Sequence, residues 1–215
     1  LLGIGAMGVI PVGAGDKLPM WDLAMDTLSQ VVVAIVIAIV VAVPLGILAG
    51  RNDTVNRLLR PILDTAQVMP QFVYLIPMIA LFNAGRVCGV VAAVIYAIPP
   101  GIRLTSLGLR EVPVAPREAA ISFGATPRQE LVKVQLPMAV RSILLGINQV
   151  VLMVLATVII AALVGAGALG LVAYEGFAKP IQKIGQSAAA GLSIVFLAIV
   201  LDRITQAWGR GPDQP

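Results

Sequence analysis

The sequence predicts an all-α membrane protein, a polytopic bundle of five complete spanning helices preceded by a partial N-terminal helix. Of the 215 residues 59% are hydrophobic and only 12% are charged, and the mean hydropathy is +0.96. A water-soluble core of this composition would leave too few polar residues to cover its exterior, whereas lipid accepts apolar side chains there. Uncharged stretches also recur at about the 20-residue length that a helix needs to cross a bilayer.

The first element is an uncharged run through Gly15, which contains Pro11 and is too short to span a bilayer comfortably. We interpret it as the end of a truncated first helix rather than a cleaved signal, because no basic segment precedes it. Residues 1–26 then form a partial helix and an outer segment. The uncharged stretches that follow predict spans over residues 27–50, 65–85, 87–109 (interrupted only by Arg103), 142–174 and 184–201.

Orientation follows from the positions of Lys and Arg, of which the chain has 15. Alternate connections hold eleven of them, and the opposite side holds only Lys17, Arg86, Lys179 and Lys183. By the positive-inside rule the richer side is cytoplasmic. Residues 27–208 therefore form the transmembrane domain, with a cytoplasmic loop over 111–137 and a cytoplasmic tail over 209–215. The eleven are Arg51, Arg57, Arg60, Arg103, Arg110, Arg117, Arg128, Lys133, Arg141, Arg203 and Arg210.

The segment from Glu118 to Pro137 is a polar island inside this apolar chain. Pro116 suits the first turn of a short helix, and Gly124 suits the left-handed residue that ends one. Thr126 with Gln129 three residues later predicts a capping box at the start of a second helix, which Pro137 would end before the next span begins. We expect a rigid bracket of two short helices; the alternative is an amphipathic helix lying on the lipid headgroups.

Within this loop E-A-A, a glycine four residues later and a final Leu-Pro resemble the EAA loop of ABC importer permeases. The resemblance implies the type I (MetI-like) permease fold. It also implies that the loop is a coupling helix that docks into a groove on a cytoplasmic ABC ATPase subunit. The residues at the motif positions, and hence the expected ATPase-coupling residues, are Glu118, Ala119, Ala120, Gly124 and Pro137.

Further segments, among them RLLRPILDTAQVMPQFVYLIPMIALF, IPPGIRLTSLGLREVP and VIIAALVGAGALG, are similar to the glycine betaine/proline betaine branch of these permeases. The similarity implies a subunit of the bacterial cytoplasmic (inner) membrane that imports glycine betaine or a related quaternary amine. Its implied partners are the ATPase, an extracytoplasmic substrate-binding protein and a second permease copy. The stretch 174–186 departs from the family pattern, which leaves the substrate open: methionine, another amino acid, an oxyanion or trimethylamine N-oxide remains an alternative.

The chain lacks the G-x-x-x-x-G-K-[ST] loop, so we expect ATP and Mg²⁺ to bind the partner ATPase and not this subunit. An ATP-independent channel or transporter is the more distant alternative. With no histidine and one cysteine, no catalytic or metal-binding site is expected. The basic residues are spread over the connections, which disfavours a nucleic-acid partner.

Polar side chains inside the spans are candidates for a translocation path, because polar groups in hydrocarbon need partners or water. The candidates are Gln67, Gln71, Tyr74, Asn148 and Gln149. The first two, one turn apart, are expected to share a helix face near Tyr74, and the last two lie within the span after the loop. For each residue the alternative is a hydrogen bond between helices that only holds the bundle together.

Two glycine patterns are interpreted as packing features. Gly165, Gly167 and Gly170 spell G-x-G-x-x-G, but no acidic residue follows at the distance that a dinucleotide fold requires. We expect them to bend the outer end of a membrane helix or to let helices approach. Gly46 and Gly50 form G-x-x-x-G and are expected to serve helix packing, with a dimer interface as the alternative.

Overall fold

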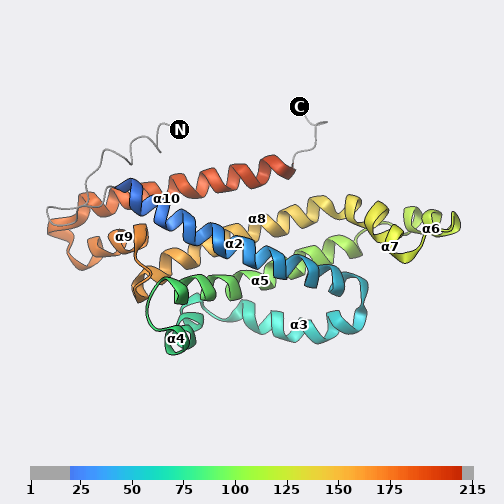
Figure 1. Cartoon of the computed structure of the whole chain (residues 1–215), viewed down its shortest axis with the longest axis horizontal. Helices are drawn as coiled ribbons and strands as arrows, with labels where there is room; N and C mark the ends of the chain where they lie inside the picture. Colours follow the sequence, from blue (N-terminus) through green and yellow to red (C-terminus); the bar gives the residue numbers. More distant parts are fainter. Residues whose placement is uncertain (1–19, 210–215) are drawn as a thin grey trace.

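The structure is a computed structural model, which describes residues 20–209 except the side chains of residues 177, 180–182, 208 and 209. Over these residues all regular structure is helical and forms one elongated bundle (Figure 1). The helices are α2 (Met20–Arg51), α3 (Asp53–Val68), α4 (Gln71–Phe82), α5 (Arg86–Arg110), α6 (Val114–Ser122), α7 (Pro127–Glu130), α8 (Leu136–Ala161), α9 (Ala168–Ala178) and α10 (Pro180–Gly209).

The core lies where α2, α5 and α8 pack along their lengths. Small side chains dominate it, with Ala34 and Ala38 of α2 and Ala97 of α5 fully buried against Val150 and Val154 of α8. Residues without long side chains allow helix backbones to approach closely, which is how helices associate in lipid. The packing role expected for Gly46 and Gly50 is confirmed, because added Cβ atoms there would collide with Thr105 and Leu109 of α5.

Four described helices are long and apolar enough to cross a membrane, and the pair α3 and α4 forms a fifth crossing if it counts as one broken span. Bending by 99° separates these two helices, so the prediction of one continuous span over residues 65–85 is wrong. The break lies at Met69 and Pro70, both in extended backbone. Proline disfavours helical geometry at the preceding residue and donates no backbone hydrogen bond.

The predicted span over residues 142–174 is also wrong at its C-terminal end. Helix α8 ends at Ala161, a 3-10 turn (Ala162–Val164) follows, and α9 starts only at Ala168. Gly165 and Gly167 both have positive φ, +87° and +73°, which L-residues with side chains rarely adopt. The bend that we expected at these glycines is therefore confirmed, at the C-terminal end of α8.

At its other end α8 is longer than expected. The chain runs without a break from Pro127 of α7 through a π-helical turn (Leu131–Gln135) into α8, so Pro137 does not end a helix as predicted. Leu136 donates its backbone N–H to Leu131, five residues back, instead of four. The wider turn directly before Pro137 relieves the clash that a proline ring makes with the previous helical turn.

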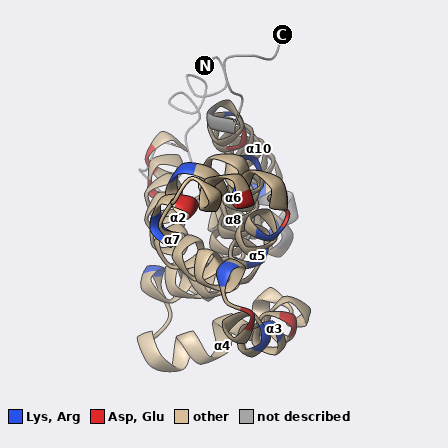
Figure 2. Ribbon diagram, turned by 90° about the vertical axis from the view of Figure 1, so that its right-hand side faces the viewer, with Lys and Arg blue, Asp and Glu red and all other residues tan. Residues whose placement is uncertain are grey.

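The first helix described, α2, already begins at Met20, so residues 20–26 are helical and not part of a separate outer segment. The partial helix expected before it, and the tail beyond Gly209, lie outside the described residues. Acidic and basic residues occur together at the end of the bundle that carries α6 and α7, as the end-on view of the ribbon shows (Figure 2). At the other end lie two ion pairs, Arg86 with Asp26 and Lys183 with Glu175.

Candidate functional site

The polar loop projects beyond one end of the bundle as a compact bracket formed by α6, α7 and the turn between them (Figure 1). Gly124 has φ +79° and ends α6. The Ala125 N–H donates to the Ala120 carbonyl at 3.0 Å, and the Gly124 N–H donates to the Ile121 carbonyl at 2.9 Å. This is the Schellman pattern, which satisfies the last carbonyls of a helix and requires a left-handed residue. The predicted helix end at Gly124 is confirmed.

The predicted capping box at Thr126 is confirmed as well. The Gln129 N–H donates to the Thr126 hydroxyl at 3.3 Å, and the Thr126 N–H donates to the Gln129 side-chain oxygen at 2.8 Å. Pro127 occupies the first turn of α7, where a missing N–H costs nothing. Both ends of the turn are therefore closed by local hydrogen bonds.

Glu130 joins the two helices of the bracket. Its side chain is only 8% exposed, and its Oε1 accepts hydrogen bonds at 2.8 Å from Arg117 of α6 and from Gln135 in the π-helical turn. The bond and charge of Arg117, together with Gln135 and Arg51, hold the pKa of the Glu130 carboxyl below its ordinary value, although burial opposes that shift. A charged carboxylate therefore fixes α6 against the start of the long helix.

One arginine connects the bracket to the bundle, and a second joins the helix ends beside it. Arg51, at the end of α2, donates from Nη2 to the Pro127 carbonyl at 3.3 Å. Arg110, at the end of α5, pairs with Asp53 at 2.8 Å and donates to the Ala49 carbonyl at 2.8 Å. These groups and Arg117 line a polar cavity of about 370 Å³ between the bracket and the ends of α2 and α5. Arg51 thus supplies a direct hydrogen bond from the bundle to the bracket, while Arg110 joins the ends of α2, α3 and α5.

The structure presents most of the predicted coupling residues on the outside of this bracket. Glu118, Ala119 and Gly124 are exposed and Ala120 is half-buried. Pro137 is exposed too, but it lies on the continuing helix and not in α6 or the turn.

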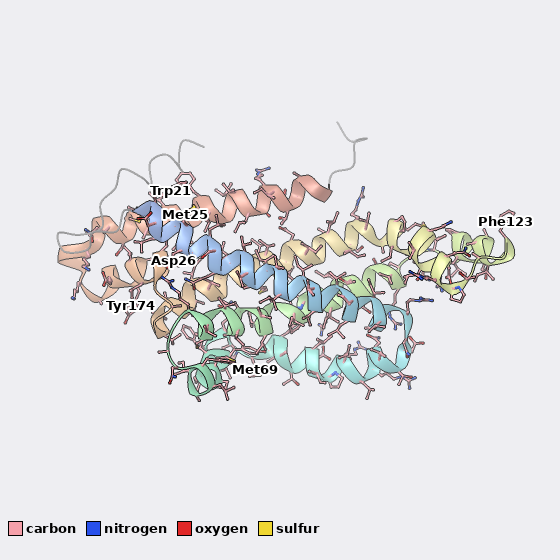
Figure 3. The ribbon with its side chains drawn as sticks, viewed as in Figure 1. Trp21, Met25, Asp26, Met69, Phe123 and Tyr174 are labelled. Atoms are coloured by element: carbon pink, nitrogen blue, oxygen red, sulfur yellow. The ribbon has the colours of Figure 1, made fainter. Side chains whose placement is uncertain are left out.

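Sequence reasoning missed two features of the bracket. Phe123 is 92% exposed at the extreme end of the molecule (Figure 3), and Ile121 nearby is 56% exposed. Two large apolar residues inside a polar loop were a visible signal for a contact surface. Glu130 was missed because its partners lie on other elements, and nothing in the sequence next to it distinguishes a buried glutamate from an exposed one.

The second candidate region is a pocket of about 290 Å³ between α3, α5 and α8, lined by Gln67, Tyr96, Pro100, Gln149 and Met153. Two of the predicted path residues, Gln67 and Gln149, therefore meet there.

Tyr74 lies behind the wall of this pocket. Its ring contacts Tyr96 edge to face, with centroids 5.5 Å apart, and its hydroxyl donates to the Ala66 carbonyl at 2.5 Å. The hydrogen bond crosses the bend between α3 and α4 (Met69 marks this bend in Figure 3). Tyr74 thus holds the bend and orients Tyr96.

The other two path candidates lie elsewhere. The Asn148 side-chain oxygen accepts a hydrogen bond from Thr205 of α10 at 2.7 Å, which is the helix-to-helix contact considered as its alternative. Gln71 does not share a helix face with Gln67 as expected, because the bend at Pro70 places them on different helices.

The chain resembles known proteins over most of its length. Residues 42–211 match the family described as "Binding-protein-dependent transport system inner membrane component". The glycine betaine transport system permease protein OpuAB of Bacillus subtilis (strain 168) is 50% identical over 191 residues, which are 89% of this chain and 67% of that protein.

A second relative is the glycine betaine/proline betaine transport system permease protein ProW of Escherichia coli (strain K12), which is 43% identical over 209 residues. These residues are 97% of this chain but only 58% of ProW, so the chain spans little more than half of that relative's length. Among solved structures, a chain of the MetNI methionine ABC transporter in an inward-facing conformation superposes with a TM-score of 0.76. It is 24% identical, and the match covers 86% of this chain and 94% of that one, which shows a shared fold.

Proposed function

The chain belongs to the family of binding-protein-dependent transport system inner membrane components, and on that basis we propose that it is the permease subunit of an ATP-driven importer. We propose glycine betaine, or a closely related quaternary amine, as the cargo. The observation that carries the proposal is the rigid, exposed bracket at one end of a multi-pass helix bundle. The sequence identity of 50% to a glycine betaine permease supports the cargo. This subunit provides the path through the membrane, and a partner subunit hydrolyses ATP.

In this proposal the bracket and the C-terminal end of α10 lie in the cytoplasm of a bacterial cell, and α9 lies on the outer side. The excess of Arg and Lys in the connections on the bracket's side supports this orientation. A substrate-binding protein would then deliver cargo at the outer end, where the chain departs from the family pattern in residues 174–186.

The proposed mechanism is alternating access between two permease copies. ATP and Mg²⁺ bind the partner ATPase subunits, whose closure draws the two brackets together and reopens the path outward. Val114, Ile121 and Phe123 give each bracket an exposed apolar surface, at 61%, 56% and 92%, which suits burial in a groove on the ATPase. Glu118 and Ala119 are exposed beside them.

Charge substitutions in the bracket test the proposal in the complex of permease, ATPase and binding protein. Gly124→Asp and Glu118→Lys are expected to lower substrate-stimulated ATP hydrolysis while membrane insertion stays normal, because both change the docking surface. Glu111→Lys, the same charge reversal at an exposed position outside the two bracket helices, is the matched control. Normal coupled uptake in both bracket variants would contradict the assignment.

Substrate selection is proposed to lie mainly in the binding protein. The described membrane helices offer few aromatic rings for a quaternary ammonium ion, which is recognised through aromatic faces because its nitrogen donates no hydrogen bond. Calorimetry on the purified permease and ATPase, without the binding protein, is expected to show no tight binding of glycine betaine. Measuring whether choline or trimethylamine N-oxide inhibits the uptake of glycine betaine distinguishes the alternative cargoes.

A further inference from the structure

The pocket between α3, α5 and α8 lies halfway along the bundle. Tyr96 and Pro100 stand on either side of the midpoint of α5 (Arg86–Arg110), and Gln149 stands at the midpoint of α8 (Leu136–Ala161). At a rise of about 1.5 Å per residue, these positions are roughly equally far from both ends of their helices. A solute that crosses the bundle reaches this depth after leaving either surface.

The residues around this pocket combine an aromatic ring with amides. Tyr96 is half-buried, and its ring plane is fixed by the edge-to-face contact with Tyr74. Gln67 and Gln149 each bring amide N–H donors, and Met153 brings a polarisable thioether. An aromatic face attracts a quaternary ammonium group, and an amide N–H donates to a carboxylate or an N-oxide oxygen.

None of the five lining residues carries a charge at neutral pH. A ligand with a net positive charge would therefore lose part of its hydration in this half-buried pocket without a compensating carboxylate, which is unfavourable. A zwitterion carries its own opposite charge, so its free-energy cost of desolvation in the pocket is smaller. The pocket thus favours net-neutral solutes over cations of similar size.

We propose that this pocket is a transit site for net-neutral methylated amines such as glycine betaine and trimethylamine N-oxide, and that it discriminates against choline. The N-methyl groups rest on the Tyr96 ring, and the negative oxygen accepts from Gln67 or Gln149. Binding is weak, because no ion pair holds the ligand, and weak binding permits release onward. The inference rests on the proposed import function for its physiological meaning.

The site is tested directly by saturation-transfer NMR on the permease and ATPase complex in nanodiscs, without the binding protein, using glycine betaine, trimethylamine N-oxide and choline at millimolar concentration. The wild type and Tyr96→Phe are expected to give N-methyl signals for the two neutral solutes. Tyr96→Leu is expected to reduce them about fivefold or more, since it removes the aromatic face. Phe196→Leu, an aromatic loss at an exposed position of α10, is the control and keeps the wild-type signal.

A second variant tests the charge argument independently of the ring. Gln149→Glu places a carboxylate in the pocket and is expected to raise the choline signal above that of glycine betaine. Wild-type binding by Tyr96→Leu, equal wild-type signals for choline and betaine, or no wild-type signal at all would each overturn the proposed site.

ATP-driven uptake into proteoliposomes with the binding protein separates the two proposals. A wild type that imports betaine but gives no N-methyl signal refutes the pocket alone. A wild type that gives the signal, lost in Tyr96→Leu, but imports nothing supports the pocket and refutes the import function.

Discussion

Glu130 shows how one residue fixes the bracket. Its carboxylate is almost fully buried, yet it accepts from Arg117 on one helix and from Gln135 on the next. Removing it leaves Arg117 without its partner and leaves the buried amide of Gln135 unsatisfied.

We therefore expect Glu130→Ala to lower the local unfolding free energy of residues 114–130 by about 2–3 kcal/mol, the usual value of hydrogen bonds to a charged group. Hydrogen–deuterium exchange of this segment measures the change. Glu118→Ala, which truncates an exposed glutamate of α6, is the control and is expected to have little effect. Equal protection in both variants would show that Glu130 does not hold the bracket.

The pH dependence of the same segment follows from the lowered pKa of Glu130, which Arg117 causes chiefly through its hydrogen bond. The folded pKa lies below the unfolded one, so the stabilisation is complete above about pH 4.3, the ordinary glutamate value, and is lost as the pH falls through the folded pKa. Exchange protection of residues 114–130, corrected for the intrinsic rate, is expected to fall in acid. In Glu130→Gln that acid-dependent fall should be reduced; an unchanged profile would contradict the assignment.

Gly124 tests backbone conformation separately from packing. An added Cβ would meet nothing within 4 Å, so only the positive φ of +79° is at issue. Gly124→Ala is expected to destabilise the bracket by about 1–2 kcal/mol, while Gly124→Asn costs less because Asn enters the left-handed region more readily. The measurement is exchange protection of residues 114–130, and a smaller loss in the Ala variant than in the Asn variant would refute the explanation.

At the scale of elements, a side-chain hydrogen bond spans the junction between α3 and α4. Tyr74 of α4 reaches back across the 99° bend and donates to Ala66 in the last turns of α3. Helix ends leave carbonyl groups without intrahelical partners, so this bond satisfies an acceptor as well as joining the helices.

We expect Tyr74→Phe to lower the protection of residues 66–74 against hydrogen exchange by about 1 kcal/mol, the net value of one hydrogen bond. Tyr174→Phe, which removes an exposed hydroxyl from α9, is the matched control. If both variants behave like the wild type, the bend is maintained by Pro70 and apolar packing alone.

The elements differ in how far the sequence predicts them. The capping box of Thr126 and the helix end at Gly124 were predictable because each depends on residues within five positions of each other. A bend at Pro70 was a possibility that the sequence offered, but its size of 99° and the uninterrupted helix through Pro137 did not follow from the local sequence. Pro70 separates α3 from α4, whereas a π-helical turn before Pro137 accommodates that proline within a continuous helix. Tertiary packing determines which of the two outcomes occurs.

At the scale of the whole molecule, composition and charge were enough to predict a membrane helix bundle. They did not predict which side chains from different helices line the same pocket. Gln67 and Gln149 were selected because they are polar within apolar spans, and the structure brings them to one pocket. Tyr96 completes that pocket and was not selected, because an aromatic residue in a span looks the same whether it faces lipid, core or cavity. Contacts between α3, α5 and α8 are set by the fold and not by any local pattern.

The proposed orientation of the bundle is testable with single cysteines. Phe123 and Tyr174 lie at opposite ends of the molecule and are both exposed (Figure 3). Cys88 is buried and is the one cysteine of the chain, so Cys88→Ala gives a background free of thiols. In right-side-out vesicles a membrane-impermeant maleimide is expected to label Tyr174→Cys at once and Phe123→Cys only after permeabilisation. The reverse pattern would invert the topology.

The helix that runs without a break from Pro127 to Val164 contains 38 residues and is therefore about 57 Å long. It begins inside the bracket and extends past the depth of Gln149 towards α9. A rod of this length acts as a lever: when it pivots about its middle, a tilt of one degree moves each end by about 0.5 Å, in opposite directions. In the proposed mechanism, a force that draws the bracket inward on one side of the membrane would thus appear as an outward swing on the other.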